Sequence, residues 1–398
     1  MTNGLGSIRP AGFTGTQLEV GKRYSVLAVP GSGFVFSNWT GTVSSNQPTL
    51  TFTMQSNLVL AANFVSNPFV AYQGDYVGLF QVRSGATPTN CGGVALKITD
   101  KGAYTGKLVL GGVALPISGA FSPAGVSSTS VRSLGRTFAV LLVVDAMDKM
   151  VNGTVTFGNE SATLFAQRIF QGATNPYAGT HTGLILGPGN DDASPGGDGL
   201  ITLSVSPNGQ VKAAVALADG TTLTIMTALT QDGRVPLYTP LQAGSGMLFG
   251  YLDLQWSKTP PFLWVKKTSL RDKYYPQGFT ESRTAYLLPY TPPTPSQDAV
   301  NWDSAQLIVG GGNLAVPLTN TVVLTNDQIR LVSGSLSNLV VRITAKDGSV
   351  SGTFLAPGAK TPTAYKANLL QTLPLTSGGG FFLGTNHAGY FKLVPVNN

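Results

Sequence analysis

Residues 19–64, which decide the fold of the N-terminal part, read EVGKRYSVLAVPGSGFVFSNWTGTVSSNQPTLTFTMQSNLVLAANF. Turn residues at 30–33 and 46–48 separate runs in which apolar side chains recur at alternate positions or cluster, the pattern of strands with one buried face. These apolar positions are Val20, Tyr24, Val26, Ala28, Phe34, Phe36, Trp39, Leu50, Phe52 and Met54. A module this small needs large aromatic side chains to build a core. The stretch therefore predicts a small β module with an aromatic core.

Short signposts occur in order along this module. Residues 4–10 read G-x-G-x-I-x-P, Tyr24 follows, Trp39-Thr40-Gly41 comes next, and Ala62-Asn63-Phe64 completes the pattern. With these signposts, residues 4–64 resemble the InlB B-repeat type of bacterial module, and we expect the first domain at residues 1–66. The resemblance implies a small β-grasp-like unit of the kind found in tandem on secreted and cell-surface proteins, and it implies no catalytic group.

The start of the chain departs from that family in one respect. Such modules normally open with an alternating strand before the Gly-x-Gly turn, but only three residues precede Gly4. We therefore expect the chain to be a fragment of a longer polypeptide. The same expectation accounts for the missing export signal, which would be a basic segment followed by an apolar one.

Composition points to an all-β protein. The 398 residues include 49 Gly and 25 Pro, only 11% are charged, and Glu occurs three times, which disfavours surface helices. A chain of this length is expected to hold two to four domains. The net charge of +7 is a mild excess over so long a chain, so we expect no nucleic-acid partner. Cys91 is the only cysteine, and no run is long enough for a membrane span.

The remainder of the chain contains internal similarity. Gly74–Phe80 recurs in weaker form as Gly179–Ile185, and each copy is followed by a Gly-rich loop and a hairpin, at residues 94–110 and 200–217. A third, partial hairpin spans residues 339–355. Each hairpin has a Gly-containing turn that supplies positive φ. We therefore expect two or three tandem β-barrel or β-sandwich units at residues 67–175, 176–295 and 296–398, the third either separate or packed with the second.

The opening of the first unit and the segment GFFLGT at residues 380–385 carry a second resemblance. They are similar to GxYxGLF-type β-repeats of large, uncharacterised surface proteins of verrucomicrobial type. This resemblance implies no activity.

A cluster of acidic residues is the one candidate metal site. Asp191, Asp192 and Asp198 lie in a Gly-rich loop, and three carboxylates with nearby carbonyls could hold Ca²⁺, which binds six to eight oxygens. The loop lacks the residue order of an EF-hand, and a solvated loop between two strands is the alternative interpretation. Ca²⁺ is the only cofactor that the sequence indicates.

The stretch from Trp256 to Tyr290 combines aromatic rings with cations. Rings that stack on sugars, beside cations that pair with sulfate or carboxylate groups, would suit an acidic polysaccharide. An ordinary strand with Trp264 facing the core is the alternative. The candidate ligand-binding residues are Trp256, Trp264, Lys266, Lys267, Arg271, Lys273, Tyr274, Tyr275 and Arg283.

Catalysis has little support in the sequence. The chain has only two histidines, His181 and His387, and neither accompanies a G-x-S-x-G motif. No motif selects a pair of carboxylates for glycoside hydrolysis. His181 takes the place of Tyr76 in the repeat, so we expect it on a strand surface. We therefore predict no catalytic residues and no enzyme.

These observations favour a non-catalytic fragment of a bacterial secreted or cell-surface protein with a structural, adhesive or ligand-presenting role. Its partner would be an acidic polysaccharide or another surface protein. One alternative is a carbohydrate-binding region attached to a polysaccharide-active enzyme outside this fragment. A further alternative is a self-assembling surface-layer or filament subunit, which low charge and exposed strand edges would permit.

Overall fold

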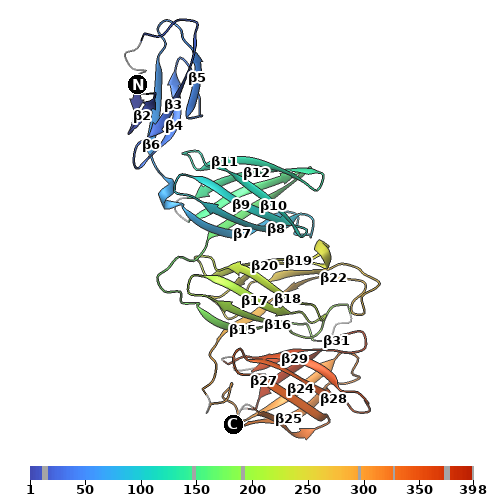
Figure 1. The fold of residues 1–398 in the computed structure, drawn as a ribbon. Helices are drawn as coiled ribbons and strands as arrows, with labels where there is room; N and C mark the ends of the chain where they lie inside the picture. The colour runs from blue at the N-terminus through green and yellow to red at the C-terminus, as the bar shows by residue number, and fades with distance from the viewer. Residues whose placement is uncertain are drawn as a thin grey trace. The chain divides into compact units, whose positions relative to one another are not determined.

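The computed structural model describes residues 1–10, 17–145, 149–189, 193–294, 297–325, 328–371 and 377–396. Within these ranges the chain is all-β, as predicted, with two short 3₁₀ turns, η1 (Phe69–Ala71) and η2 (Gln242–Gly244), and no α-helix. Figure 1 labels many of the strands, numbered in chain order. The chain divides into two compact units, one formed by residues 1–76, 95–107 and 115–166, the other by residues 77–94, 108–114 and 167–398. A search of the described helices finds no segment that could cross a membrane.

The N-terminal module consists of two three-stranded sheets, ordered β1-β6-β4 and β2-β3-β5. Trp39 is fully buried at its centre, and its Nε1 donates a hydrogen bond to the carbonyl of Pro48 at 3.1 Å. Gly4 has φ +84°, and a Cβ there would lie 2.1 Å from the carbonyl oxygen of Phe64, which explains the glycine at this position. The strands are β1 (Thr2–Asn3), β2 (Gly6–Arg9), β3 (Arg23–Pro30), β4 (Phe34–Gly41), β5 (Thr49–Thr53) and β6 (Leu60–Ser66).

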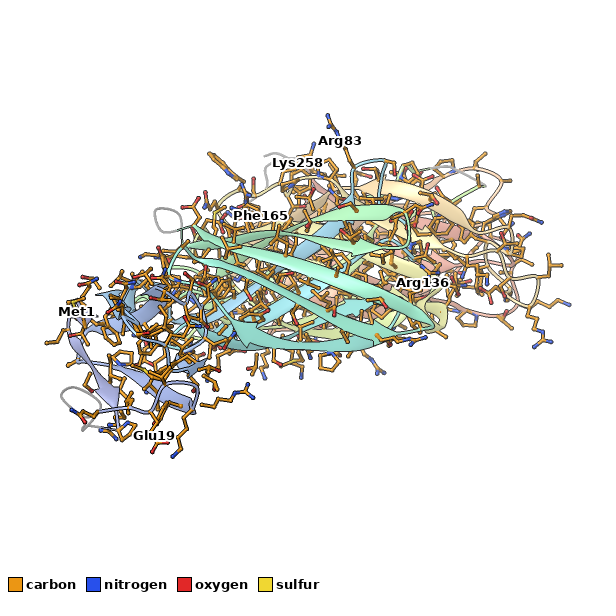
Figure 2. All side chains as sticks on the ribbon, turned by 90° about the horizontal axis from the view of Figure 1, so that it is seen from above. Met1, Glu19, Arg83, Arg136, Phe165 and Lys258 are labelled. Atoms are coloured by element: carbon orange, nitrogen blue, oxygen red, sulfur yellow. The ribbon has the colours of Figure 1, made fainter. Side chains whose placement is uncertain are left out.

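An eight-stranded sheet follows, ordered β10-β9-β8-β7-β14-β13-β12-β11. Its two edge strands approach each other, because the Thr129 hydroxyl on β11 donates to the Ser118 carbonyl on β10 at 3.2 Å. The sheet is therefore a nearly closed barrel. Arg83, in the turn after β7, extends away from the ribbon (Figure 2). The strands are β7 (Gly74–Val82), β8 (Cys91–Ile98), β9 (Ala103–Leu110), β10 (Val113–Ala120), β11 (Val126–Ser133), β12 (Arg136–Asp145), β13 (Met150–Phe157) and β14 (Glu160–Arg168).

The middle part forms a five-stranded sheet, β18-β17-β16-β15-β23, and a four-stranded sheet, β19-β20-β21-β22. A single residue, Thr284, separates β22 from β23, so one broken strand passes from the four-stranded sheet to the five-stranded sheet. The apolar faces of both sheets share one core. The strands are β15 (Gly179–Ile185), β16 (Gly199–Val205), β17 (Gln210–Ala216), β18 (Thr222–Ala228), β19 (Arg234–Leu241), β20 (Gly246–Asp253), β21 (Phe262–Lys266), β22 (Phe279–Arg283) and β23 (Ala285–Tyr290).

The C-terminal part is a second eight-stranded sheet, ordered β26-β25-β24-β31-β30-β29-β28-β27. Its edge strands β26 and β27 lie in contact, so this sheet is also nearly closed. The buried Asn320 holds the turn between them, since its Oδ1 accepts from the Leu336 backbone N–H at 2.9 Å. The strands are β24 (Ser304–Gly311), β25 (Leu318–Thr325), β26 (Gln328–Gly334), β27 (Ser337–Thr344), β28 (Ser349–Leu355), β29 (Thr363–Leu369), β30 (Gly378–Leu383) and β31 (Ala388–Pro395).

The first barrel, the middle part and the C-terminal part each form a meander of the same kind. In each, the last strand pairs with the first: β7 with β14, β15 with β23 and β24 with β31. The repeated openings Gly74–Phe80 and Gly179–Ile185 lie on the equivalent first strands β7 and β15. The third hairpin is not equivalent to the other two. It joins the fourth and fifth strands of its meander, β27 and β28, whereas β8–β9 and β16–β17 are second and third strands. A Gly-containing hairpin turn therefore recurs between different strands of the meander.

The outer faces of the middle and C-terminal sheets pack together within one compact unit. Buried Asn368 on β29 donates from Nδ2 to the carbonyls of Gly183 at 2.9 Å and Ile201 at 3.3 Å. The Thr182 hydroxyl donates to the Asp347 carbonyl at 2.6 Å. The apolar part of this contact consists of Leu184, Leu200, Ala218, Leu288, Leu370 and Phe381. Strands β19, β20 and β21 of the four-stranded sheet contact β8 instead. In this contact, Met247 Sδ lies 3.3 Å from Cys91 Sγ.

His181 is buried, contrary to the expectation that it lies on a strand surface. Only 4% of it is exposed, and its counterpart Tyr76 is fully buried. His181 and Ile185 lie on the same side of β15, and the cross-strand partner of His181, Leu203, belongs to the core. Both repeats therefore use the third residue of the opening motif as an interior side chain. Burial lowers the pKa of His181 below its ordinary value of 6.5.

We predict that stability falls with acidity because of His181. Above pH 6.5 the imidazole is neutral in both states; below it, the unfolded chain binds a proton that the folded chain resists, so the free energy of unfolding declines until the lowered folded pKa is reached. His181→Phe should remove this part of the pH dependence. Denaturant unfolding at pH 7.5 and pH 5 measures it, and an unchanged slope in the variant would contradict the assignment.

Candidate functional site

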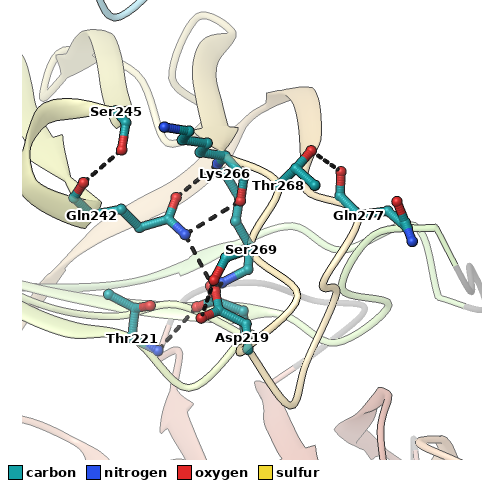
Figure 3. Close-up of polar contacts among 10 residues, drawn as sticks. Asp219, Thr221, Gln242, Ser245, Lys266, Thr268, Ser269 and Gln277 are labelled. Carbon is teal, nitrogen blue, oxygen red and sulfur yellow. Dashed lines mark hydrogen bonds and ion pairs between the residues drawn. The ribbon is translucent and has the colours of Figure 1, made fainter.

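The structure brings three turns together at one end of the middle part. They are the β17–β18 turn with Asp219, the β19–β20 turn with Gln242, and the long loop between β21 and β22 at residues 267–278. We call this last segment the cationic loop, because it carries Lys267, Arg271 and Lys273. Figure 3 shows the polar contacts that join the three turns.

Lys266, at the base of the cationic loop, is committed to internal ion pairs. Its Nζ lies 3.3 Å from Asp219 Oδ2 and 2.8 Å from Asp272 Oδ2, and only 10% of its side chain is exposed. The hydrogen bond from Lys266 lowers the pKa of Asp272. The ammonium group therefore holds the loop to the β17–β18 turn and is not available to an external ligand.

Gln242 fixes the conformation of the cationic loop. Its Oε1 accepts from the Lys267 backbone N–H at 2.7 Å, while its Nε2 donates to the Lys267 carbonyl and to Asp272 Oδ2, both at 3.3 Å. Further along, Thr268 Oγ1 donates to the Gln277 carbonyl at 2.7 Å (Figure 3). The two arms of the loop are thus joined to each other and to the neighbouring turn.

Tyr274 and Tyr275 attach the cationic loop to the C-terminal sheet. The Tyr274 hydroxyl donates to the Gly384 carbonyl at 3.0 Å, and the Tyr275 oxygen accepts from the Ala388 N–H at 2.8 Å. Tyr275 is only 4% exposed. Lys273 Nζ lies 5.0 Å from the centre of the Tyr274 ring. The predicted stacking role does not fit Tyr275, because its ring is covered.

Trp264 and Arg283 also lie inside the protein. Trp264 is 2% exposed and packs against Phe279 with ring centroids 4.8 Å apart. The Arg283 guanidinium lies 5.9 Å from the Trp264 ring and donates to the Leu186 carbonyl, the Ser194 hydroxyl and the Pro195 carbonyl at 3.1 to 3.3 Å. The alternative interpretation, in which Trp264 faces the core, is the one that the structure shows.

Trp256 lies at the opposite end of the middle part from the cationic loop. It belongs to the β20–β21 connection, and adjacent connections of a meander alternate between ends. Its side chain is 67% exposed. Of the nine predicted residues, the structure therefore gathers Lys267, Arg271 and Lys273 as exposed groups on one loop, with the half-buried Tyr274 beside them.

Sequence reasoning missed Leu270, Gln242 and Asp219. Leu270 is 82% exposed between the cations of the loop, and the sequence signal was a single apolar residue within the polar run KKTSLRDK at residues 266–273. Gln242 and Asp219 act from distant turns, and nothing in their local sequence marks them. The loop that the structure defines is thus a polar and cationic surface with one apolar residue.

The predicted Ca²⁺ site is described only in part, because Asp191 and Asp192 lie outside the described residues. Asp198 is 5% exposed, and its Oδ1 accepts from the Gly187 N–H at 2.8 Å. Burial raises the pKa of Asp198. Among the residues that the structure describes, no three His, Cys, Asp or Glu side chains form a metal-binding group. Ca²⁺ binding therefore stays a prediction.

Comparison with known proteins identifies the N-terminal module. Residues 2–68 match the family described as the divergent InlB B-repeat domain, which confirms the resemblance stated above. Residues beyond 68 match no family, so their similarity to verrucomicrobial-type repeats stays a prediction. A search of curated proteins finds no match.

Solved structures resemble the chain only distantly. Transferrin binding protein B from Haemophilus parasuis is 8% identical, with 99% of this chain and 86% of that chain covered and a TM-score of 0.23. The protein of that name from serogroup B Neisseria meningitidis is 9% identical over 77% of this chain and 66% of that one, with a TM-score of 0.22. An endo-1,5-α-L-arabinanase from Thermotoga petrophila is 10% identical over 77% and 81%, with a TM-score of 0.20.

Proposed function

We propose that the chain is a non-catalytic, ligand-presenting segment of a bacterial secreted or cell-surface protein, and that its cationic loop binds an acidic polysaccharide. The match of residues 2–68 to the InlB B-repeat family supports the extracellular setting. The observation that carries the ligand is the loop itself, which displays three exposed cations on a fixed backbone. No activity is assigned to either histidine.

The basic residues at the cationic loop differ in whether an internal carboxylate neutralises them. Lys266 is neutralised by Asp219 and Asp272, whereas Lys267, Arg271 and Lys273 form no ion pair with any carboxylate in the described part of the chain. Cations that point into solvent remain available to sulfate or carboxylate groups, and hydrogen bonds between charged partners are the stronger ones. Because Asp272, the acidic residue of the loop, pairs with Lys266, the other cations of the loop remain available to a ligand.

The hydrogen bonds around Gln242 reduce the entropic cost of binding. A loop that is ordered before the ligand arrives loses less freedom on association than a mobile one. Leu270 adds an apolar contact for the face of a sugar ring, between Lys267 and Lys273. The arrangement favours repeated acidic sugars over a small neutral one, because each cation contributes little alone.

A charge-removal experiment tests this function. We expect Lys267→Gln with Arg271→Gln and Lys273→Gln to weaken binding of polygalacturonate or chondroitin sulfate about tenfold at 50 mM NaCl, since three exposed pairs contribute about 0.5 kcal/mol each. Isothermal titration calorimetry measures the effect.

A control with the same charge change is available on the first barrel. Lys97, Lys101 and Lys107 are exposed, and their replacement by Gln should change the affinity less than twofold. Equal weakening in both triple variants would show that net charge alone attracts the polymer. Unchanged binding in the loop variant would also reject the proposed site.

A further inference from the structure

A groove lies on the outer face of the C-terminal sheet, and none of the residues that line it belongs to the set predicted from the sequence. Its volume is about 750 Å³, and strands β27, β28, β29 and β30 form its floor. Gly220 and Pro362 also line it. A volume of this size is in the range of small-ligand sites and suits a sugar of one or two rings.

Three polar side chains form a row across the floor of this groove. Arg342 on β27 pairs with Ser351 on β28, and Ser351 pairs with Lys366 on β29. Directly paired residues of neighbouring strands project to the same face. The inward neighbours Val350 and Tyr365 belong to the core and Val341 packs against it, so the row faces outward. All three side chains are exposed.

The spacing of the row suits an anionic group. Neighbouring strands lie about 4.8 Å apart, so the Cα atoms of Arg342 and Lys366 are separated by about 10 Å with Ser351 between them. Long side chains from both strands can reach a group bound over the Ser351 hydroxyl. Arginine supplies a planar fork of donors, lysine a compact positive charge, and serine a further donor.

The last 69 residues of the chain, which include most of the groove, carry mainly positive charges. From residue 330 to residue 398 the sequence holds one carboxylate side chain, Asp347, against six basic residues: Arg330, Arg342, Lys346, Lys360, Lys366 and Lys392. Asp347 is engaged by Ser349, whose backbone N–H and hydroxyl donate to Asp347 Oδ1 at 3.0 and 2.7 Å. In the described residues no carboxylate pairs with Arg342 or Lys366 within 4 Å. Both cations are therefore free to bind an external anion.

Apolar side chains also line the groove. Val340, Ala364 and Leu383 line it beside the charged row, and Val340 is 43% exposed. Apolar surface next to two cations suits a ligand with a charged end and a less polar ring. A bare inorganic ion would leave this surface uncovered.

We propose that this groove binds a sugar that carries a phosphate or sulfate group, with the group held by Arg342, Ser351 and Lys366 and the ring placed against Val340 and Leu383. The site uses residues other than those of the cationic loop and binds a different ligand from the polymer proposed there. It gives the C-terminal sheet a small-ligand function of its own.

Calorimetry at 50 mM NaCl with glucose 6-phosphate, galactose 6-sulfate and glucose tests the proposal. We expect millimolar or tighter binding of at least one charged sugar and no binding of glucose. Whichever charged sugar binds identifies the group. If neither binds below 10 mM, or if glucose binds equally, the proposal is wrong.

Variants then locate the bound group. Arg342→Gln and Lys366→Gln should each weaken binding five- to tenfold, and Ser351→Ala two- to fivefold. Lys346→Gln and Lys360→Gln remove exposed lysines of the same sheet that do not line the groove, and should change affinity less than twofold. The triple variant of the cationic loop should bind the sugar normally. Equal weakening by the control lysines would overturn the assigned site.

Discussion

Replacing Asn368 by aspartate is expected to lower the free energy of unfolding by about 3–5 kcal/mol at pH 7, because it places an uncompensated carboxylate in a buried contact. In the native protein, Asn368 is 1% exposed and its Nδ2 donates to the carbonyls of Gly183 and Ile201. An ionised aspartate has no donor to offer and would face two carbonyl oxygens. Equilibrium denaturation in urea measures the loss.

The pH dependence of the Asn368→Asp variant sharpens this prediction. Burial raises the pKa of a carboxyl group, so the folded variant holds its proton to a higher pH than the unfolded chain does. Its deficit relative to the native protein should therefore be small below pH 4 and grow as the pH rises. Asn301→Asp, an exposed change of the same kind, should alter stability by less than about 0.5 kcal/mol. A pH-independent deficit would contradict the proposed cause.

Replacing Trp264 by alanine should cost about 3–5 kcal/mol of stability, because it empties a large buried volume. The ring packs against Phe279 and lies near the Arg283 guanidinium, and either neighbour would have to leave its own contacts to fill the space. Trp264→Phe should cost less. It keeps much of the packing and removes the buried Nε1, which has no hydrogen-bond partner among the described residues.

Trp256 provides the matched control, since it belongs to the same predicted site but is 67% exposed. Trp256→Ala should change the free energy of unfolding by less than about 0.5 kcal/mol. Thermal and urea unfolding of both alanine variants measure the contrast. Similar losses in the two would show that the buried environment of Trp264 does not determine its contribution.

The sequence predicted the architecture well because turns and alternation are local properties. The hairpins at residues 94–110, 200–217 and 339–355 all form, since Gly-containing turns and half-buried strands depend on neighbours in sequence. The position of the third hairpin within its meander was not predictable, because pairing order depends on distant strands. The same holds for the break at Thr284, which divides the middle part into two sheets.

The candidate site was less predictable than the fold. Composition alone placed Lys266 with Lys267 and Tyr275 with Tyr274, although the structure assigns the members of each pair different surroundings. Lys266 meets Asp219 from a turn 47 residues away, and Tyr275 meets Ala388 from a strand 113 residues away. No local pattern reports such partners. The sequence alone therefore does not show which cations stay exposed, because this depends on which carboxylates the fold places beside them.

Because the strand is interrupted at Thr284, the middle meander consists of two sheets that contact different strands. The sheet that contains β15 and β23 contacts the C-terminal sheet through Leu184 and Leu288, whereas the sheet that contains β20 contacts β8 through Met247. One chain segment, β22 followed by β23, belongs to both. The two sheets of the middle part therefore make separate contacts, one with the C-terminal sheet and one with β8.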